Sequence, residues 1–408
     1  MRYSALFILI LACLQTAASQ DAPAAPSPGA VSTLKVDVKL VPVRVVVRDS
    51  QGRAVGNLAK DDFQLFDQGK LQVITQFSIE QSGAQRATEP TQLGDKNTPR
   101  AASGRYLLYL FDDLHLERTD LVQAREAVDR QLASLSSARE RAAIFTTSGQ
   151  KGLDFTSDRR KLHEALSHLE PRGRQRASDC PKMSYYMADL IVNRGDEDVL
   201  QVATQDALKC GFDGNRKFTK SARAMARGVA AEEAGIGRVE TQASLHILKD
   251  LVQGMSKAPG ERTIVIVSPG LFVAEEQAQG EITDLAVRAD VTVSALDPRG
   301  LIAPNDVTQT GAFDPNKLAY GSLSDSQEWA LLEELADGTG GVFFHSNNDV
   351  EEGFRRVTAA PEYSYVLAFS PQEVKLDGRF HKVKVTLKNT GRLTVQARKG
   401  YYAPKRKP

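Results

Sequence analysis

Continuous apolar runs, separated by helical segments, constrain the fold of this chain of 408 residues more than any other feature. The runs lie at residues 106–111, 142–146, 263–267 and 291–296. Strands that are buried on both faces have this composition. Helical segments are expected at 121–135, 159–169, 221–256, 282–289, 329–337 and 350–359. Strands that alternate with helices predict an α/β domain with a mostly parallel, doubly wound sheet over residues 105–360.

Both flanks of this α/β region are predicted to be β-structure. Residues 34–80 and 361–404 contain alternating apolar and polar positions, most clearly at 382–387. About 45 residues form only a marginal core on their own. We therefore expect the two flanks to pack as one small β-sandwich into which the α/β domain is inserted, and two separate small domains are the alternative. The polar residues 81–104 are typical of a linker.

The N-terminal residues have the pattern of a secretory signal peptide. Arg2 precedes a short apolar run, and small residues at 17–19 favour cleavage after Ser19. The Ala/Pro-rich residues 20–33 then indicate a tether. We expect a secreted or periplasmic protein without a transmembrane helix in its mature chain. An uncleaved anchor, or a surface lipoprotein attached at Cys13, is the less favoured alternative.

Cleavage after residue 19 leaves two cysteines, Cys180 and Cys210. In an oxidising compartment, two cysteines favour a single disulfide, and two buried thiols are the alternative. They lie in an expected insertion at about 177–220, which also carries Tyr185 and Tyr186. A loop held by a disulfide and bearing tyrosines predicts a recognition surface, and a structural cover for the sheet is the equally weighted alternative.

Polar side chains follow the ends of the expected strands. They are Asp112, Asp113, Thr147, Ser148, Ser268 and Asp297. Sites in open α/β sheets form outside the carboxyl ends of the strands, so we expect these side chains to meet at one edge. The alternative is that Asp112 and Asp113 only accept hydrogen bonds from backbone N–H groups near helix starts.

Several sequence blocks, in this order, resemble the secreted bacterial VWFA-related domain family of the acidobacterial type. They lie at residues 43–77, 111–115, 154–159, 296–301, 338–341 and 398–402. The resemblance covers nearly the whole mature chain and implies a von Willebrand factor A-type domain.

Domains of this type often bind a divalent cation at the carboxyl ends of the strands, through an Asp-x-Ser-x-Ser pattern and further oxygen ligands. Asp112 matches the first position of that pattern, but Leu114 and Leu116 replace the serines. The resemblance therefore implies a degenerate metal-ion-dependent adhesion site. Its candidate ligands are Asp112, Asp113 and His115, and its candidate ions are Mg²⁺ and Ca²⁺.

The function expected from these features is a non-enzymatic protein-binding or adhesion module. The partner would be a protein, a cell-envelope component or the extracellular matrix. Nucleic acid is excluded, because 52 basic and 51 acidic residues leave a net charge of only +1. A metal-assisted hydrolase that uses Asp112, Asp113 and His115, and a metal-free envelope scaffold, are the alternatives.

Overall fold

The computed structural model describes residues 40–51, 53–81, 104–134, 140–150, 152–173, 180–274, 276–301, 315–359, 362–371, 379–388 and 391–403. These ranges belong to one compact unit, Lys39–Pro408. The expected signal peptide and tether, and nearly all of the expected linker, lie outside the described residues. None of the helices in these ranges combines the length and apolarity that a membrane span requires.

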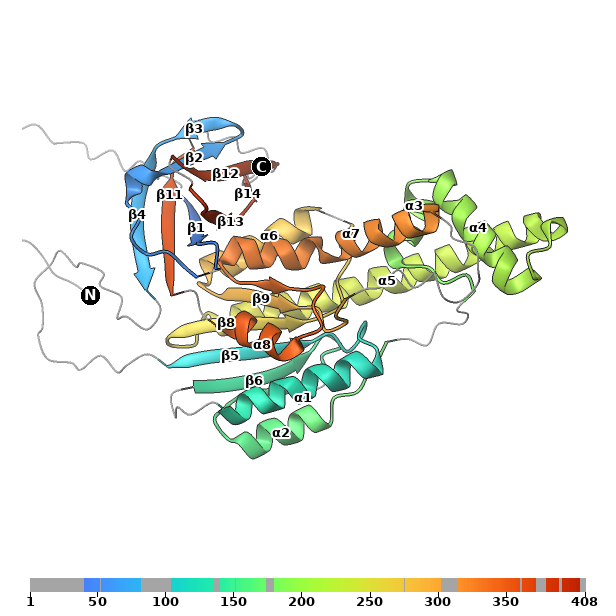
Figure 1. The fold of residues 1–408 in the computed structure, drawn as a ribbon, viewed down its shortest axis with the longest axis horizontal. Coiled ribbons are helices and arrows are strands. Elements are labelled where there is room, and N and C mark those ends of the chain that lie inside the picture. The colour runs from blue at the N-terminus through green and yellow to red at the C-terminus, as the bar shows by residue number, and fades with distance from the viewer. Residues whose placement is uncertain are drawn as a thin grey trace, which may run out of the picture. The chain divides into compact units, whose positions relative to one another are not determined.

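A six-stranded sheet forms the centre of the α/β domain, with the strand order β10-β9-β8-β5-β6-β7 (Figure 1). Its strands are β5 (Arg105–Phe111), β6 (Glu140–Thr146), β7 (Gly152–Thr156), β8 (Glu261–Val267), β9 (Thr292–Leu296) and β10 (Phe343–Phe344). All neighbouring pairs are parallel except β6 and β7. The first strand of the domain, β5, lies near the middle, and the order reverses beside it, as in doubly wound folds. The predicted fold class is confirmed.

Helices cover both faces of this sheet because its strands are apolar on both faces. One face packs against α1 (Arg118–Ser134), α2 (Arg159–Ser167) and α8 (Val350–Thr358). The other packs against the C-terminal half of α5 (Thr219–Met255), α6 (Glu276–Arg288) and α7 (Pro315–Thr339). Along β5, Tyr109 and Phe111 belong to the first core, whereas Leu108 and Leu110 belong to the second.

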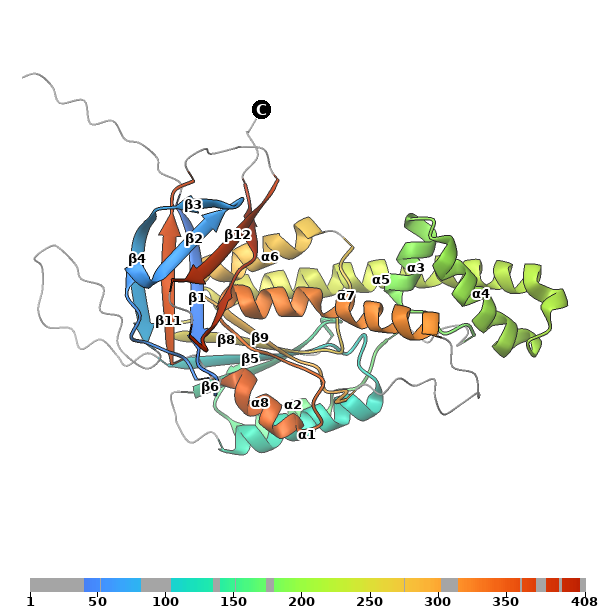
Figure 2. The same cartoon turned by 45° about the horizontal axis from the view of Figure 1, so that its top comes forward.

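The flanking β segments form two further sheets, with the orders β13-β1-β11-β4 and β14-β12-β2-β3. The N-terminal strands are β1 (Val41–Arg48), β2 (Phe63–Asp67), β3 (Lys70–Gln72) and β4 (Ile74–Gln81), with a 3-10 turn, η1 (Lys60–Asp62), before β2. The C-terminal strands are β11 (Tyr363–Phe369), β12 (Phe380–Leu387), β13 (Thr394–Ala397) and β14 (Gly400–Tyr402). Each sheet mixes strands from both ends (Figure 2). The two sheets share one apolar core. The expected joint sandwich is confirmed.

Largely buried ion pairs join the sandwich to the α/β domain. Arg44 on β1 pairs with Asp290, which also pairs with Arg262 at 3.0 Å. Arg398, whose side chain is only 3% exposed, pairs with Asp284 on α6. Most of the surface of these charged groups is shielded from solvent, so their pairing helps to fix the contact.

The expected insertion is a helical arm rather than a loop. It consists of α3 (Tyr185–Asn193), α4 (Glu197–Phe212), a 3-10 turn, η2 (Arg216–Phe218), and the first half of α5 (Figures 1 and 2). Alanines at every fourth position of α5, from Ala222 to Ala234, face the other arm helices in a separate apolar core. The expected disulfide between Cys180 and Cys210 is present and ties the start of the arm to α4.

Candidate functional site

Asp112 lies at the centre of a hydrogen-bonded cluster at the carboxyl edge of the sheet. It follows β5, whereas Thr147 follows β6 and Ser268 follows β8. The Thr147 hydroxyl donates to Asp112 Oδ1 at 2.8 Å, and the Ser268 hydroxyl donates to Oδ2 at 2.6 Å. Asp112 is only 1% exposed. Three neighbouring strands thus converge on one carboxylate, as the topological argument predicts.

His115 lies against the same carboxylate. Its Nδ1 is 2.9 Å from both oxygens of Asp112, and its Nε2 is 3.7 Å from Glu240 Oε2 on α5. Burial by itself lowers the pKa of His115, but Asp112 and, further away, Glu240 and Glu328 raise it to about 9. Burial likewise raises the pKa of Asp112, but His115, Ser268 and Thr147 outweigh it and lower that pKa. The cluster therefore contains an imidazolium–carboxylate pair at neutral pH.

Asp113 has a different role, because it holds the loop that follows β6. Its Oδ1 accepts from the backbone N–H of Ser148 at 2.9 Å and faces the Thr147 hydroxyl at 3.2 Å. Its Oδ2 accepts from the Ser148 hydroxyl at 2.6 Å. The alternative expectation, that these carboxylates only accept hydrogen bonds from backbone N–H groups, holds in part for Asp113. Its backbone partner, however, lies on the loop that follows the neighbouring strand β6.

A divalent cation does not fit the residues as they are arranged. Asp112 already has partners at both oxygens, and Leu114 and Leu116 supply no oxygen where the resemblance places serines. Within the described ranges, no three acidic, histidine or cysteine side chains converge as a metal shell requires. A cavity of about 10 Å³ beside Asp112 has room for about one water molecule, which is too little for a hydrated Mg²⁺.

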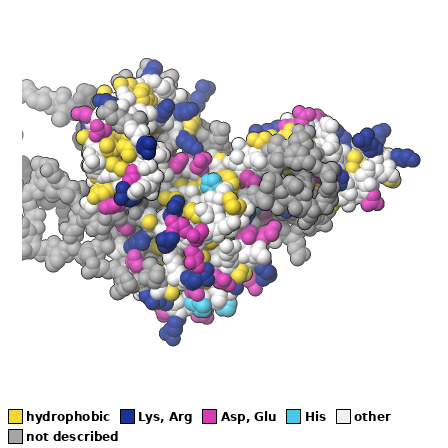
Figure 3. Space-filling model, in the orientation of Figure 1, with side chains coloured by type: hydrophobic (Ala, Val, Ile, Leu, Met, Phe, Trp, Pro, Cys, Tyr) yellow, Lys and Arg dark blue, Asp and Glu magenta, His cyan; other side chains and the backbone are white. Residues whose placement is uncertain are grey.

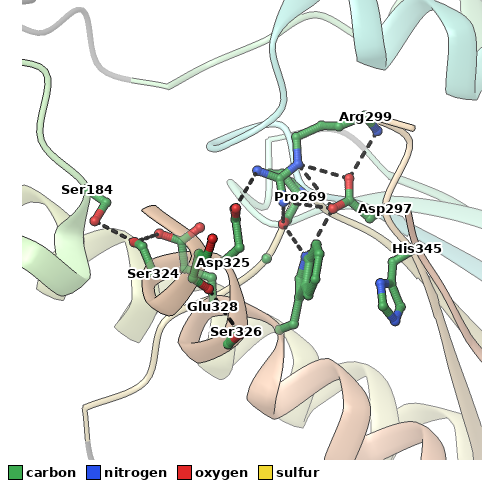
Figure 4. Close-up of polar contacts among 12 residues, drawn as sticks. Ser184, Pro269, Asp297, Arg299, Ser324, Asp325, Ser326, Glu328 and His345 are labelled. Carbon is green, nitrogen blue, oxygen red and sulfur yellow. Dashed lines mark hydrogen bonds and ion pairs between the residues drawn. The ribbon is translucent and has the colours of Figure 1, made fainter. Parts of the chain in front are cut away.

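A second buried carboxylate, Asp297, follows β9 at the same edge (Figure 4). Arg299 Nε lies 3.0 and 3.1 Å from its two oxygens, and Trp329 Nε1 donates to Oδ2 at 3.0 Å. Arg299 and Trp329 also donate to the carbonyl of Pro269. Asp297 therefore acts through these two side chains to fix the loop after β8, which carries Ser268.

The rim above these buried groups is formed by helices. Glu328 on α7 accepts from Ser324 at 3.1 Å, and the Ser324 hydroxyl also forms a hydrogen bond of 2.6 Å with the hydroxyl of Ser184, the N-cap of α3 (Figure 4). Burial raises the pKa of Glu328, despite the opposing effect of Arg299. Glu240 Oε1 is buried and has no hydrogen-bond partner among the described residues. The rim thus contains buried carboxyl groups whose polar partners do not fully offset the cost of their burial.

Tyr185 and Tyr186 pack at the base of the arm instead of standing on a free loop. Their rings lie 5.0 and 5.2 Å from the ring of Phe272, which follows β8. A Cβ at Gly237 on α5 would lie 2.3 Å from the Tyr185 ring, so that close packing requires glycine there. This contact matches the structural-cover alternative, and a recognition role for the two tyrosines stays a prediction.

Glu240, Glu328, Arg299 and Trp329 were not predicted as site residues. Glu240, Glu328 and Trp329 lie on long helices, where their spacing carries no metal or catalytic motif. The sequence signal that existed was the block at 296–301, in which Arg299 follows Asp297 by two residues. A short acid-x-arginine spacing after a strand end predicts a local ion pair, and the structure contains one.

The stability of the protein is expected to fall as the pH rises from about 6.5 to 9. The folded-state pKa of His115, about 9, lies above the usual value of 6.5, so the folded state binds more protons than the unfolded state in this window. The stabilisation is complete below the unfolded-state pKa and is lost as the pH rises through the folded-state pKa. Urea unfolding at a series of pH values measures this slope, and His115→Gln should flatten it. An unchanged slope in that variant would contradict the assignment.

No family model matches this chain, and no curated protein matches it either. By its sheet order, the domain belongs to the doubly wound, Rossmann-like α/β class. Among solved structures, it is similar to an aerotolerance-related membrane protein from Bacteroides fragilis, with 11% identity over 62% of this chain and 98% of that chain and a TM-score of 0.31. It is also similar to the conserved hypothetical protein BatB from Bacteroides thetaiotaomicron, with 13% identity over 62% of this chain and 95% of that chain and a TM-score of 0.29. Likeness at these values does not establish a shared function, so the function must be inferred from the side chains at the sheet edge.

Proposed function

We propose that this chain is a secreted, non-enzymatic binding module of the von Willebrand factor A type, and that it binds its partner without a metal ion. The observation that carries the proposal is the His115 imidazole, 2.9 Å from both oxygens of the Asp112 carboxylate. In this proposal the imidazolium supplies the positive charge that a divalent cation supplies in other domains of this type. Leu114 and Leu116 replace the two serines of the metal-binding pattern, which is consistent with a site that binds no metal ion.

The arrangement supports binding over hydrolysis. A metal-assisted hydrolase needs about three protein ligands and an open coordination position. The oxygens of Asp112 and Asp113 are occupied by hydroxyl, backbone and imidazole donors. Ser148 donates to Asp113, and no histidine contacts it within the described chain, so the edge lacks an activated nucleophile there.

The charge of the rim favours a cationic partner. Glu240, Glu328 and Asp325 outnumber the cations His115 and Arg299, and one oxygen of Glu240 has no hydrogen-bond partner among the described residues. A lysine or arginine from a partner protein or envelope component would satisfy this rim. In domains of this type that bind a metal ion, a carboxylate from the partner completes the coordination shell. In this proposal the partner contributes a cation instead of an anion.

Metal removal tests the proposal. The melting temperature is expected to stay within about 1 °C when EDTA, excess Mg²⁺ or excess Ca²⁺ is added, because a bound ligand in large excess would raise it by several degrees. Capture of envelope proteins on the immobilised chain is the second readout, and it should persist in EDTA. A rise in melting temperature with Mg²⁺ or Ca²⁺ that Asp112→Ala abolishes would overturn metal-independent binding.

A further inference from the structure

The tip of the helical arm has a concentrated positive charge that the sheet-edge site does not use. Residues 206–227 contain six basic and two acidic side chains, whereas the whole chain has a net charge of +1. The basic side chains are Lys209, Arg216, Lys217, Lys220, Arg223 and Arg227. Lys and Arg side chains gather at this end of the arm (Figure 3).

The tip is a defined turn, and its geometry presents these charges outward. Asp213 ends α4 in the left-handed conformation with φ 48°, and Gly214 continues the reversal with φ 72°. Asn215 then accepts from the backbone N–H of Lys217 at 3.1 Å and caps η2. Arg216 and Lys217, both exposed, lie on the turn itself. The disulfide at Cys210 anchors the end of α4, just before this turn, to the start of the arm.

Five of these six basic side chains are divided into two groups. Arg223 and Arg227 form ion pairs with Glu197 at the start of α4. Arg216, Lys217 and Lys220 lie nearer the turn, and among the described residues they form no ion pair. Their charge is therefore available to an external anion, and exposed ammonium and guanidinium groups exchange water for phosphate oxygens readily.

An exposed aromatic ring lies among these charges. Phe218 is 46% exposed at the end of η2, and its ring stacks on Phe212 with the centroids 5.4 Å apart. Phe212 packs against the apolar core of the arm. Because Phe218 is held from one side only, half of an apolar ring faces solvent between Lys217 and Lys220. Basic side chains around an apolar aromatic group are typical of segments that bind at a membrane interface.

We propose that this tip docks onto the surface of a bilayer that contains anionic phospholipids. Arg216, Lys217 and Lys220 would contact lipid phosphates, and Phe218 would enter the boundary between headgroups and acyl chains. The charges surround one turn at the end of a two-helix hairpin, whereas a nucleic acid requires cations that follow its backbone. The tip shares no residue with the sheet edge, so this proposal does not depend on the proposed function.

Vesicle co-sedimentation of the full chain tests the docking. Phosphatidylcholine vesicles are compared with vesicles of equal parts phosphatidylcholine and phosphatidylglycerol at low ionic strength. We expect binding to the anionic vesicles only, with release by salt. The triple variant Arg216→Ser, Lys217→Ser, Lys220→Ser should lose about a hundredfold in partitioning, at roughly fivefold for each basic side chain. Phe218→Ser should lose about tenfold and leave the salt dependence unchanged.

A matched charge change elsewhere serves as the control. Arg159→Ser, Arg160→Ser, Lys161→Ser removes three exposed cations from α2 and should bind vesicles like the parent. The substituted tip residues are exposed, so an unchanged melting temperature verifies that each variant is folded. Equal binding to neutral vesicles, equal losses in the control, or binding to double-stranded DNA but not to vesicles would each overturn the proposal.

Discussion

Replacement of Asp112 with alanine is expected to destabilise the protein by about 3–5 kcal/mol, the usual cost of removing one partner of a buried ion pair. His115 Nδ1 loses the two carboxylate oxygens that lie 2.9 Å from it, and the Ser268 hydroxyl loses an acceptor at 2.6 Å. The measurement is urea unfolding at pH 7, where His115 is charged. A loss smaller than about 1 kcal/mol would mean that the pair contributes little.

Two further variants identify the cause of that loss. Adding His115→Leu to Asp112→Ala should recover part of the stability, because it replaces the imidazole that has lost its partner with an apolar side chain. Asp158→Ala is the matched control, since Asp158 is also a hydrogen-bonded carboxylate, but its partners are two backbone N–H groups at the N-terminus of α2. Its loss should be about 1 kcal/mol, the value of a helix cap.

Replacement of Asp297 with alanine is expected to destabilise the protein by about 3 kcal/mol. Arg299 loses both oxygens of a buried carboxylate, and Trp329 loses one of its two acceptors. Because these side chains also hold the Pro269 carbonyl, the loop that carries Ser268 should loosen with them. Urea unfolding measures the loss, and faster hydrogen exchange of the backbone N–H of Gly270 would locate it.

Asp325→Ala is the matched control for this prediction. Asp325 faces the same guanidinium at 3.5 Å, but both side chains are 26% exposed. Solvent screens such a pair, so the expected loss is below about 1 kcal/mol. If the two variants were equally destabilised, burial of Asp297 would not be the source of its contribution.

The sequence allowed the prediction of strands whose two faces are both buried. β5, β6, β8 and β9 have continuous apolar runs, so composition alone locates them. β7 was not predicted, because it lies at the edge of the sheet and none of its residues is fully buried. An edge strand does not need an apolar run, so no such signal exists for it.

The helices were predicted less completely. α7 begins at Pro315, although helix was expected only from residue 329. Gly321 and the serines at 322, 324 and 326 have low helix propensity, and contacts with the arm compensate for this. Helix was expected for the α5 part of the arm, but α3 and α4 were expected as a loop, although Asp196 is an N-cap signal before α4 that could have indicated that helix.

The site could be predicted only where it depends on strand ends. Asp112, Thr147, Ser268 and Asp297 were expected at one edge because parallel strands place their carboxyl ends together. Glu240 and its counterparts on α7 reach the same edge from helices whose packing is set by the tertiary fold. Their distance along the chain from Asp112 exceeds any local pattern, so sequence spacing gave no signal for them.

The insertion of the α/β domain between β4 and β11 determines how the protein carries tension. β4 pairs with β11, and Gln81 lies opposite Tyr363, so the chain leaves and re-enters the sandwich at adjacent points. A force that pulls on the two ends of the described chain acts on β1 and β14 and is borne by the ladders of the sandwich. The backbone of the α/β domain lies outside this path and carries no tension until the β4–β11 ladder separates. Shear or stretching along the chain would therefore leave the geometry around Asp112 intact.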